Sequence, residues 1–168
     1  MLTMILPLLA AATLSEPDNN LLEQRVVAIF APYAEADSST PSWDYPIYST
    51  EVTELIAHWR RVTPANEPDA LSEGDWLCQC QDWDESAFTA TMGERRVLSD
   101  DRVEVDIAVD LGFGGGPESV RQERLVFKRE GEGWQVDDLF APSFPDGLKQ
   151  ALRATIAEEE GVPAGERG

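Results

Sequence analysis

The sequence predicts an α+β domain in which two helices precede a run of antiparallel strands and one more helix follows them. Two observations carry this prediction. Apolar residues recur at helical spacing in residues 22–33 and 49–62, and they alternate with polar residues from Val103 onward. With 168 residues, of which 42% are apolar, the chain has enough material for one hydrophobic core. We therefore expect a single domain over residues 16–160 and a disordered tail over 161–168.

The first fifteen residues carry no charge and are mostly apolar. This run is too short to cross a membrane, and small residues around Ala11 and Ala12 suit cleavage before Glu16. We expect a signal peptide over residues 1–15, hence a periplasmic or secreted protein with no stable membrane anchor after cleavage. The alternative is an apolar first helix that is buried in the fold.

Two amphipathic helices are expected next. In the first, Leu22, Val26 and Ile29 lie on one face, and in the second, over residues 49–62, Thr50 is placed to cap the start. The segment between them is rich in aromatic residues, and we expect it to pack over the open end of the sheet.

The clearest strand is Val103–Leu111, where apolar and polar residues alternate strictly. Glycine-rich turns then separate it from two further strands, Val120–Lys128 and Trp134–Phe140. We also expect strands at Phe88–Val97 and Trp76–Cys80, which makes about five in total. A last helix follows, with Asp146 as its cap and Leu148, Leu152 and Ile156 as its apolar stripe.

The charge is strongly unbalanced, with 32 acidic residues against 13 basic ones and a formal net charge of -19. Such a chain repels the phosphate backbone of nucleic acids, so we expect no nucleic-acid partner. The same field attracts basic proteins and cationic ligands.

Two short motifs point to a family. They are Asp75-x-x-x-x-x-Gln81-Asp82 and Gly133-Trp134-x-Val136-Asp137-Asp138, the second followed by a helix that contains Leu148. With the strand-rich middle, this pattern resembles the domain-of-unknown-function 3828 family, which is placed in the nuclear transport factor 2-like superfamily. The resemblance implies a cone-like curved sheet packed on N-terminal helices and a bacterial envelope location. It is compatible with a homodimer and implies no known activity.

Two carboxylates are candidates for chemistry. Alternation places Asp138 on the same face as Trp134 and Val136, with Asp137 on the other face, and it places Asp82 in phase with Trp76. If both faces point inward, Asp82 and Asp138 converge near the mouth of the cone. There each is either held by hydrogen bonds as a structural group or acts as a general base with a raised pKa, as in isomerases of this superfamily. The candidate ligand-binding residues are Tyr48, Asp75, Gln81, Asp82, Trp134 and Asp138.

Cys78 and Cys80 are the two cysteines. On a strand their α carbons would lie about 6.6 Å apart, near the upper limit for a disulfide, so a bridge requires a kink. We favour two buried thiols and keep the bridge as the alternative. His58 is the one imidazole, so we expect no metal site, and nothing in the sequence indicates a cofactor.

The Gly112–Gly116 run is followed by a strand and contains no Lys, which excludes a phosphate loop. Hydrolase motifs are absent from the sequence as well. We therefore expect a non-catalytic module that binds a protein or a small ligand. The alternative is a small pocket enzyme, of isomerase or lyase type, that uses an inward-facing Asp as general base.

Overall fold

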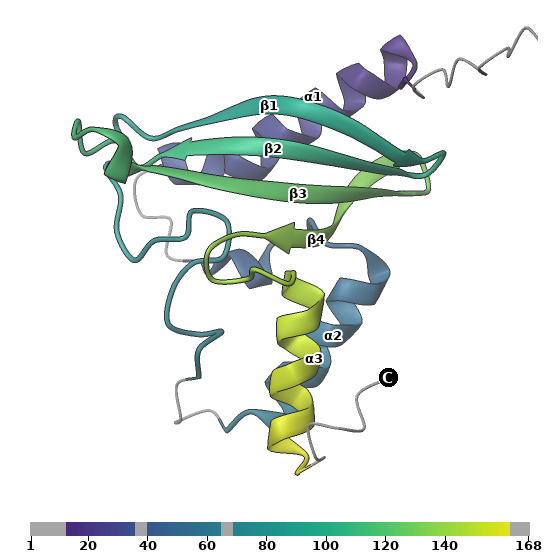
Figure 1. Ribbon diagram of the computed structural model, residues 1–168, viewed down its shortest axis with the longest axis vertical. Helices are drawn as coiled ribbons and strands as arrows, with labels where there is room; N and C mark the ends of the chain where they lie inside the picture. The colour runs from purple at the N-terminus through teal and green to yellow at the C-terminus, as the bar shows by residue number, and fades with distance from the viewer. Residues whose placement is uncertain (1–12, 36–39, 65–68, 162–168) are drawn as a thin grey trace, which may run out of the picture.

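The computed structural model describes residues 13–35, 40–64 and 69–161. Over these ranges the chain is an α+β domain with a curved antiparallel sheet of four strands and three α-helices (Figure 1). In chain order the elements are α1 Glu16–Phe30, α2 Thr50–Val62, β1 Thr89–Ser99, β2 Arg102–Asp110, β3 Val120–Glu130, β4 Gly133–Phe140 and α3 Leu148–Glu159. Among them no helix is long and apolar enough to cross a membrane.

The sheet is a simple meander in the order β1-β2-β3-β4. Its β2 strand confirms the predicted alternation, because Val103, Val105, Ile107 and Val109 are fully buried while the residues between them are partly exposed. Each consecutive pair of strands is joined by a short connection, so neighbours in sequence are also neighbours in the sheet.

The fifth predicted strand is wrong. Trp76–Cys80 forms turns, with a single bridge between Asp75 and Cys80, and Gln79 lies in the left-handed region at φ 52°. The reason is the Asp75 side chain, whose Oδ1 accepts the backbone N–H groups of Leu77 and Cys78 at 2.9 and 3.0 Å. These backbone N–H groups donate to a side chain, so they are not available for the hydrogen bonds to a neighbouring strand that a β-strand needs.

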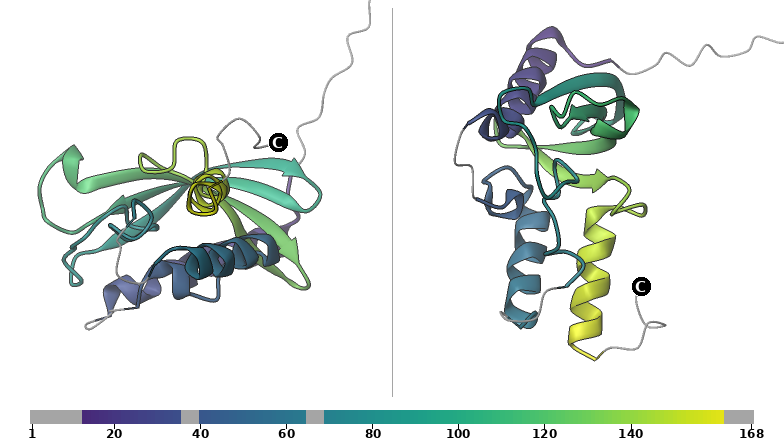
Figure 2. Two further views of the ribbon diagram at one scale, coloured as in Figure 1. Left: turned by 90° about the horizontal axis from the view of Figure 1, so that it is seen from below. Right: turned by 90° about the vertical axis from the view of Figure 1, so that its left-hand side faces the viewer.

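Helix α1 lies across one face of the sheet (Figure 2). Ser15 caps the start of this helix, because its hydroxyl accepts the Asp18 N–H. Polar contacts tie this helix to the edge strand β1 and to the inner strand β3. Arg95 of β1 binds Glu23 at 2.7 Å, and Arg129 of β3 binds Asp18. The apolar stripe of α1 is thereby held against the buried face of the sheet.

Helices α2 and α3 pack side by side and project away from the β4 edge of the sheet (Figures 1 and 2). Both predicted caps are wrong. The cap of α2 is Ser49, which accepts the Val52 N–H at 3.3 Å, and α3 begins after Gly147 with no cap from its own segment. One amide in the first turn of α3, that of Lys149, donates instead to the Asp138 carboxylate at 3.1 Å.

A bulge in β4 reverses the roles predicted for the two adjacent aspartates. Val126 of β3 pairs with Asp138, while the next residue, Phe127, pairs with Val136, so Asp137 is the extra residue. The alternation shifts by one at this point. As a result Asp137 is the fully buried carboxylate, with 0% exposure, and Asp138 is only partly buried.

The buried Asp137 joins four elements. Its carboxylate accepts the Ser49 hydroxyl at the start of α2 at 2.8 Å, Lys149 Nζ of α3 at 3.1 Å and a guanidinium nitrogen of Arg102 of β2 at 2.7 Å. Lys149 also reaches Glu51 of α2 at 3.1 Å. Three donors satisfy the buried charge, so the helix pair and the sheet are fixed to one another at this carboxylate.

We predict that Asp137→Ala lowers the free energy of unfolding by about 3 kcal/mol, because it leaves Lys149 and Arg102 without their buried partner. Asp146→Asn is the matched control: Asp146 is exposed, and its replacement changes stability by less than about 0.5 kcal/mol. Urea unfolding of both variants measures the difference. Equal stability of the two variants would contradict the role of Asp137.

Candidate functional site

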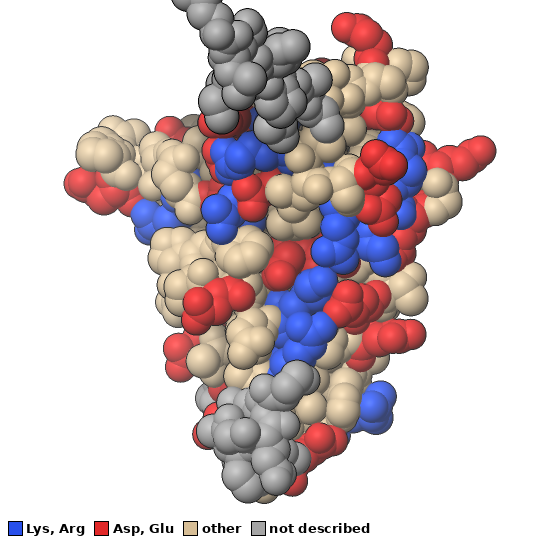
Figure 3. All heavy atoms as spheres, turned by 45° about the vertical axis from the view of Figure 1, so that its right-hand side comes forward, with Lys and Arg blue, Asp and Glu red and all other residues tan. Residues whose placement is uncertain are grey.

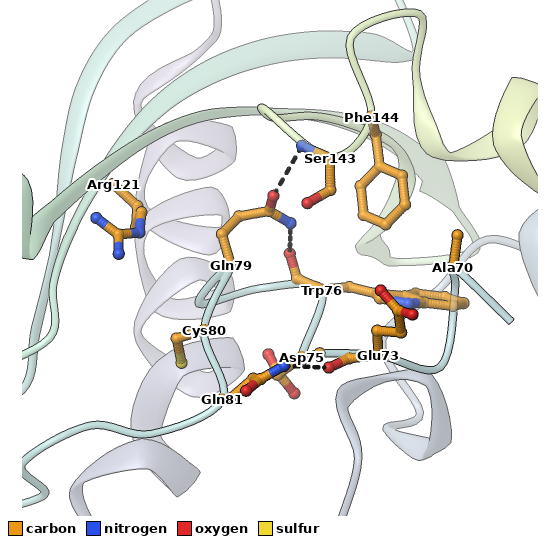
Figure 4. Close-up of a pocket in the computed structure, with 11 residues that line it drawn as sticks. Ala70, Glu73, Asp75, Trp76, Gln79, Cys80, Gln81, Arg121, Ser143 and Phe144 are labelled. Carbon is orange, nitrogen blue, oxygen red and sulfur yellow. Dashed lines mark hydrogen bonds between the residues drawn. The ribbon is translucent and has the colours of Figure 1, made fainter. Parts of the chain in front are cut away.

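A pocket of about 410 Å³ opens beside the turns of residues 75–80, between this loop, the start of β3 and the segment that follows β4 (Figure 4). Most of the surface that lines it is polar. The lining residues are Ala70, Glu73, Gly74, Asp75, Trp76, Gln79, Cys80, Gln81, Arg121, Ser143 and Phe144.

Trp76 forms the buried side of the pocket. Its indole N–H donates to the Leu71 carbonyl at 2.7 Å, and its backbone N–H donates to the Ser42 hydroxyl at 3.1 Å. The ring also packs against those of Trp59 and Phe144. The loop that carries the pocket is therefore anchored in the hydrophobic core.

Asp75 organises this loop. Besides the two amides of its own turn, its carboxylate accepts the hydroxyl of Tyr33 and the backbone N–H of Ser42 at 3.1 Å. Burial, and next the charge of Asp75, raise the pKa of the Tyr33 phenol, so Tyr33 stays protonated and donates. Asp75 thus borders the pocket with a carboxylate that four donors already hold.

Two glutamine side chains complete the loop. Gln79 donates to the Trp76 carbonyl at 2.7 Å and accepts the Ser143 N–H at 3.1 Å, which joins the loop to the segment after β4 (Figure 4). Gln81 donates to the Glu73 carbonyl at 2.9 Å. The bond to Glu73 uses its backbone carbonyl. The Glu73 carboxylate has no hydrogen bond or ion pair with another described residue.

Cys78 and Cys80 are joined in a disulfide, with their α carbons 5.1 Å apart. The favoured prediction of two buried thiols is therefore wrong, and the alternative is confirmed. A bridge needed a kink, and the turn at Gln79 supplies it by shortening the separation below the value of an extended strand.

The pocket brings together two of the predicted ligand-binding residues, Asp75 and Gln81. Asp82 lies just outside its lining and is exposed, with its carboxylate accepting the Trp83 N–H at 3.0 Å. Asp82 is therefore not an inward-facing group, because Trp76–Cys80 is not the strand that would have turned it inward.

The other three predicted residues have structural contacts elsewhere. Tyr48 is buried and pairs through its backbone with Val136 at the β4 edge, and burial raises the pKa of its phenol. Trp134 lies in the core, where its indole N–H donates to the Asp18 carbonyl at 3.3 Å. Asp138 binds the amides of Leu139 and Lys149, and burial raises the pKa of its carboxyl. The prediction that Asp82 and Asp138 converge is therefore wrong.

Sequence reasoning missed Glu123. This β3 carboxyl is 5% exposed, and neither of its oxygens has a hydrogen-bond partner among the described residues. It lies opposite the buried Ile107 and two residues from Arg121, which lines the pocket, so both face the same side of the sheet. Burial, and next the charge of Asp75, raise the pKa of Glu123 well above its usual range. In the sequence, Glu123 alternates in step with Leu125 and Phe127, and this pattern could have indicated that its side chain points inward.

Most of the described Lys and Arg side chains form ion pairs with carboxylates of the protein. On the face shown in Figure 3, blue basic and red acidic side chains lie next to one another. On the outer face of the sheet, Arg96 binds Glu104 at 2.7 Å and Asp106 at 2.6 Å, and Arg124 binds Glu104 at 3.1 Å. Glu73 lines the pocket, and Asp82 follows the lining residue Gln81 in the chain. Neither carboxylate enters an ion pair with another described residue.

A metal site is not seen in residues 13–35, 40–64 and 69–161, which hold no cluster of three or more candidate ligands. His58 lies on α2, and its Nε2 is 2.8 Å from a carboxylate oxygen of Glu160. Arg121, the one cation of the pocket lining, donates to the Glu118 carbonyl.

This α+β arrangement, with a polar pocket at one end of its sheet, can be set beside known proteins. No family model matches the chain, and no curated protein matches it. Among solved structures, a chain of the type VI native effector-immunity complex Tae3-Tai3 from Ralstonia pickettii is similar at a TM-score of 0.48 and 17% sequence identity, covering 71% of this chain and 94% of that one. A likeness of this degree defines neither a fold family nor a function.

We predict that Glu123→Gln raises the free energy of unfolding at pH 7 by about 1 to 3 kcal/mol, the scale of an unpaired buried group. The folded-state pKa of Glu123 lies above its unfolded value, so the folded protein binds the proton more tightly. The contribution of Glu123 to stability is then most favourable at acid pH and falls as the pH rises above its unfolded pKa. The variant removes that fall.

Chemical denaturation of both proteins between pH 4 and pH 8 checks this prediction. Glu132→Gln is the control, since Glu132 is exposed in the turn before β4 and makes the same change of charge. If the stability of Glu123→Gln depended on pH as that of the parent protein does, Glu123 would not be a buried carboxyl with a raised pKa.

Proposed function

We propose that this protein is a non-catalytic binding module that takes a cationic group of a basic protein or small ligand into the pocket beside residues 75–80. The observation that carries the proposal is the composition of the pocket. The free carboxylate of Glu73 borders it, together with the neutral amide side chains of Gln79 and Gln81. The pocket's own cation, Arg121, is turned to a backbone carbonyl.

The overall charge supports the same class of partner. With a formal net charge of -19, the protein attracts cations over a distance comparable to the Debye length. Internal ion pairs use much of the positive charge, as in the Arg96 and Lys149 networks. The Glu73 carboxylate at the pocket is not neutralised by an ion pair with a described residue, which favours capture of a basic partner.

A pocket enzyme with an inward-facing Asp is the weaker proposal. Neither of its two candidate bases lies in a pocket as a free carboxylate. Asp82 is exposed, and Asp138 accepts hydrogen bonds from two backbone amides. Glu123 has the raised pKa that a general base needs, but it is not part of the pocket lining. A carboxyl that substrate does not reach cannot transfer a proton to it directly.

We further propose a nuclear transport factor 2-like fold and an exported protein. The helix that crosses one face of a curved antiparallel sheet supports the first. The Cys78–Cys80 disulfide supports the second, because disulfides persist in oxidising compartments such as the periplasm. Residues 1–12 of the expected signal peptide lie outside the described residues.

The binding proposal predicts that n-butylammonium and n-butylguanidinium bind the pocket, whereas butyrate does not, because only the cations are attracted to Glu73. In two-dimensional NMR titrations the amides of Gln79 and Gln81 should shift saturably with the cations. Glu73→Gln should weaken binding by about two- to fivefold, the scale of an exposed ion pair.

Glu132→Gln removes the same charge from a turn that is not part of the pocket lining and should leave the affinity nearly unchanged. Equal binding of butyrate, or equal weakening by the two substitutions, would mean that the pocket does not select cations.

Export predicts that the full chain, expressed in a bacterial host, appears in the periplasmic or secreted fraction in a form shortened at its N-terminus. The chain that starts at Glu16 should stay in the cytosol, because it lacks the apolar leader. Cell fractionation with intact-mass measurement checks both. An uncleaved cytosolic product of the full chain would remove the proposal.

A further inference from the structure

The Cys78–Cys80 disulfide lies at the wall of the pocket, and its two sulfur-bearing residues differ in access. Cys80 lines the pocket and is 9% exposed, whereas Cys78 is fully buried at 0%. Figure 4 shows Cys80 between Gln79 and Gln81 at the edge of the cavity. A molecule that enters the pocket therefore meets Cys80 before Cys78.

The backbone between the two cysteines is held in an unfavourable conformation. Gln79 has φ 52°, and no other non-glycine residue among those described has a positive φ. The left-handed region is sterically unfavourable for a residue with a Cβ. Only this residue separates the cysteines, so opening the disulfide removes one constraint that keeps Gln79 there.

We propose that the Cys78–Cys80 disulfide is an exchangeable bond, opened by thiols that enter the pocket and attack Cys80. The attacking thiolate forms a new sulfur–sulfur bond to Cys80 Sγ as the Cys78–Cys80 bond breaks. The electron pair goes to Cys78 Sγ, which takes up a proton from solvent and becomes a thiol. A second thiol attacks the mixed disulfide, releases Cys80 and leaves the protein as a dithiol while the two attacking thiols become a disulfide.

The charge of the pocket sets which thiols react. Glu73 and Asp75 border the same cavity as Cys80, with Arg121 as the one cation of the lining. The net charge of the lining is therefore negative, and it repels an anionic thiol and attracts a cationic one. The natural reactant is thus a thiol on a cationic molecule, such as a cysteine flanked by basic residues. This activity goes beyond the binding function and needs the pocket alone.

The first experiment treats the native protein with cysteamine, quenches the reaction with acid and maps the mixed disulfide by mass spectrometry. We expect cysteamine on Cys80 and a free thiol on Cys78. This measurement uses the unaltered chain, so it does not depend on the folding of a cysteine variant. Cysteamine found on Cys78, or a bond that opens only in denaturant, would overturn the proposal.

Single-cysteine variants give an independent check of access. In Cys78→Ser, the remaining Cys80 should form a mixed disulfide with cystamine in the folded protein. In Cys80→Ser, the remaining Cys78 should react only after denaturation, because it is fully buried. Equal labelling of both folded variants would contradict the assignment of Cys80 as the attacked sulfur.

The charge preference is measured with cysteamine and 3-mercaptopropionate, each rate divided by that of the same thiol with bis(2-hydroxyethyl) disulfide. This ratio removes the intrinsic reactivity of the two thiols. Cysteamine should be favoured, and Glu73→Gln should reduce the preference by about two- to fivefold, whereas Glu132→Gln should not. A preference that is unchanged by Glu73→Gln would refute the role of the pocket charge. It would leave the binding of butylammonium to be judged by its own titration.

Discussion

The fold depends most on the buried carboxylate of Asp137. A fully buried charge is tolerated only when several donors hold it, and here a helix cap, a lysine of the last helix and an arginine of the second strand all meet it. The β4 bulge is what turns this residue inward, and the next residue, Asp138, then binds the start of α3. Two adjacent aspartates in one strand thereby fix the helix pair to the sheet.

A second carboxylate, that of Asp75, holds the loop beside the pocket together, as Asp137 holds the helix pair to the sheet. Four donors converge on it, and two of them belong to its own turn. This turn places Trp76 in the core and the Cys78–Cys80 disulfide at the pocket wall. It also brings the Gln79 side chain into a hydrogen bond with the Ser143 N–H. The surface of the site is therefore rigidly supported, while its own charge, on Glu73, is left free for a partner.

Hydrophobic periodicity predicted the helices and β2 well, because each has one wet face and one buried face. Strand β1 was also predicted, although its residues are only partly buried or exposed. It failed at Trp76–Cys80, where a side chain rather than a neighbouring strand satisfies the backbone, and at Asp137 and Asp138, where one extra residue reverses the alternation. Of the site, Asp75 and Gln81 were found from their motif, but Glu73, Gln79 and Arg121 come together only through tertiary contacts. Glu123 could have been found as the charged residue in phase with Leu125 and Phe127.

The central claim is that the pocket beside residues 75–80 receives a cationic group. A crystal structure of the protein soaked with n-butylguanidinium tests it most directly. The account predicts the guanidinium within the pocket, with its nitrogens in hydrogen-bond contact with the Glu73 carboxylate. An empty pocket, with the guanidinium bound to other surface carboxylates instead, would contradict it.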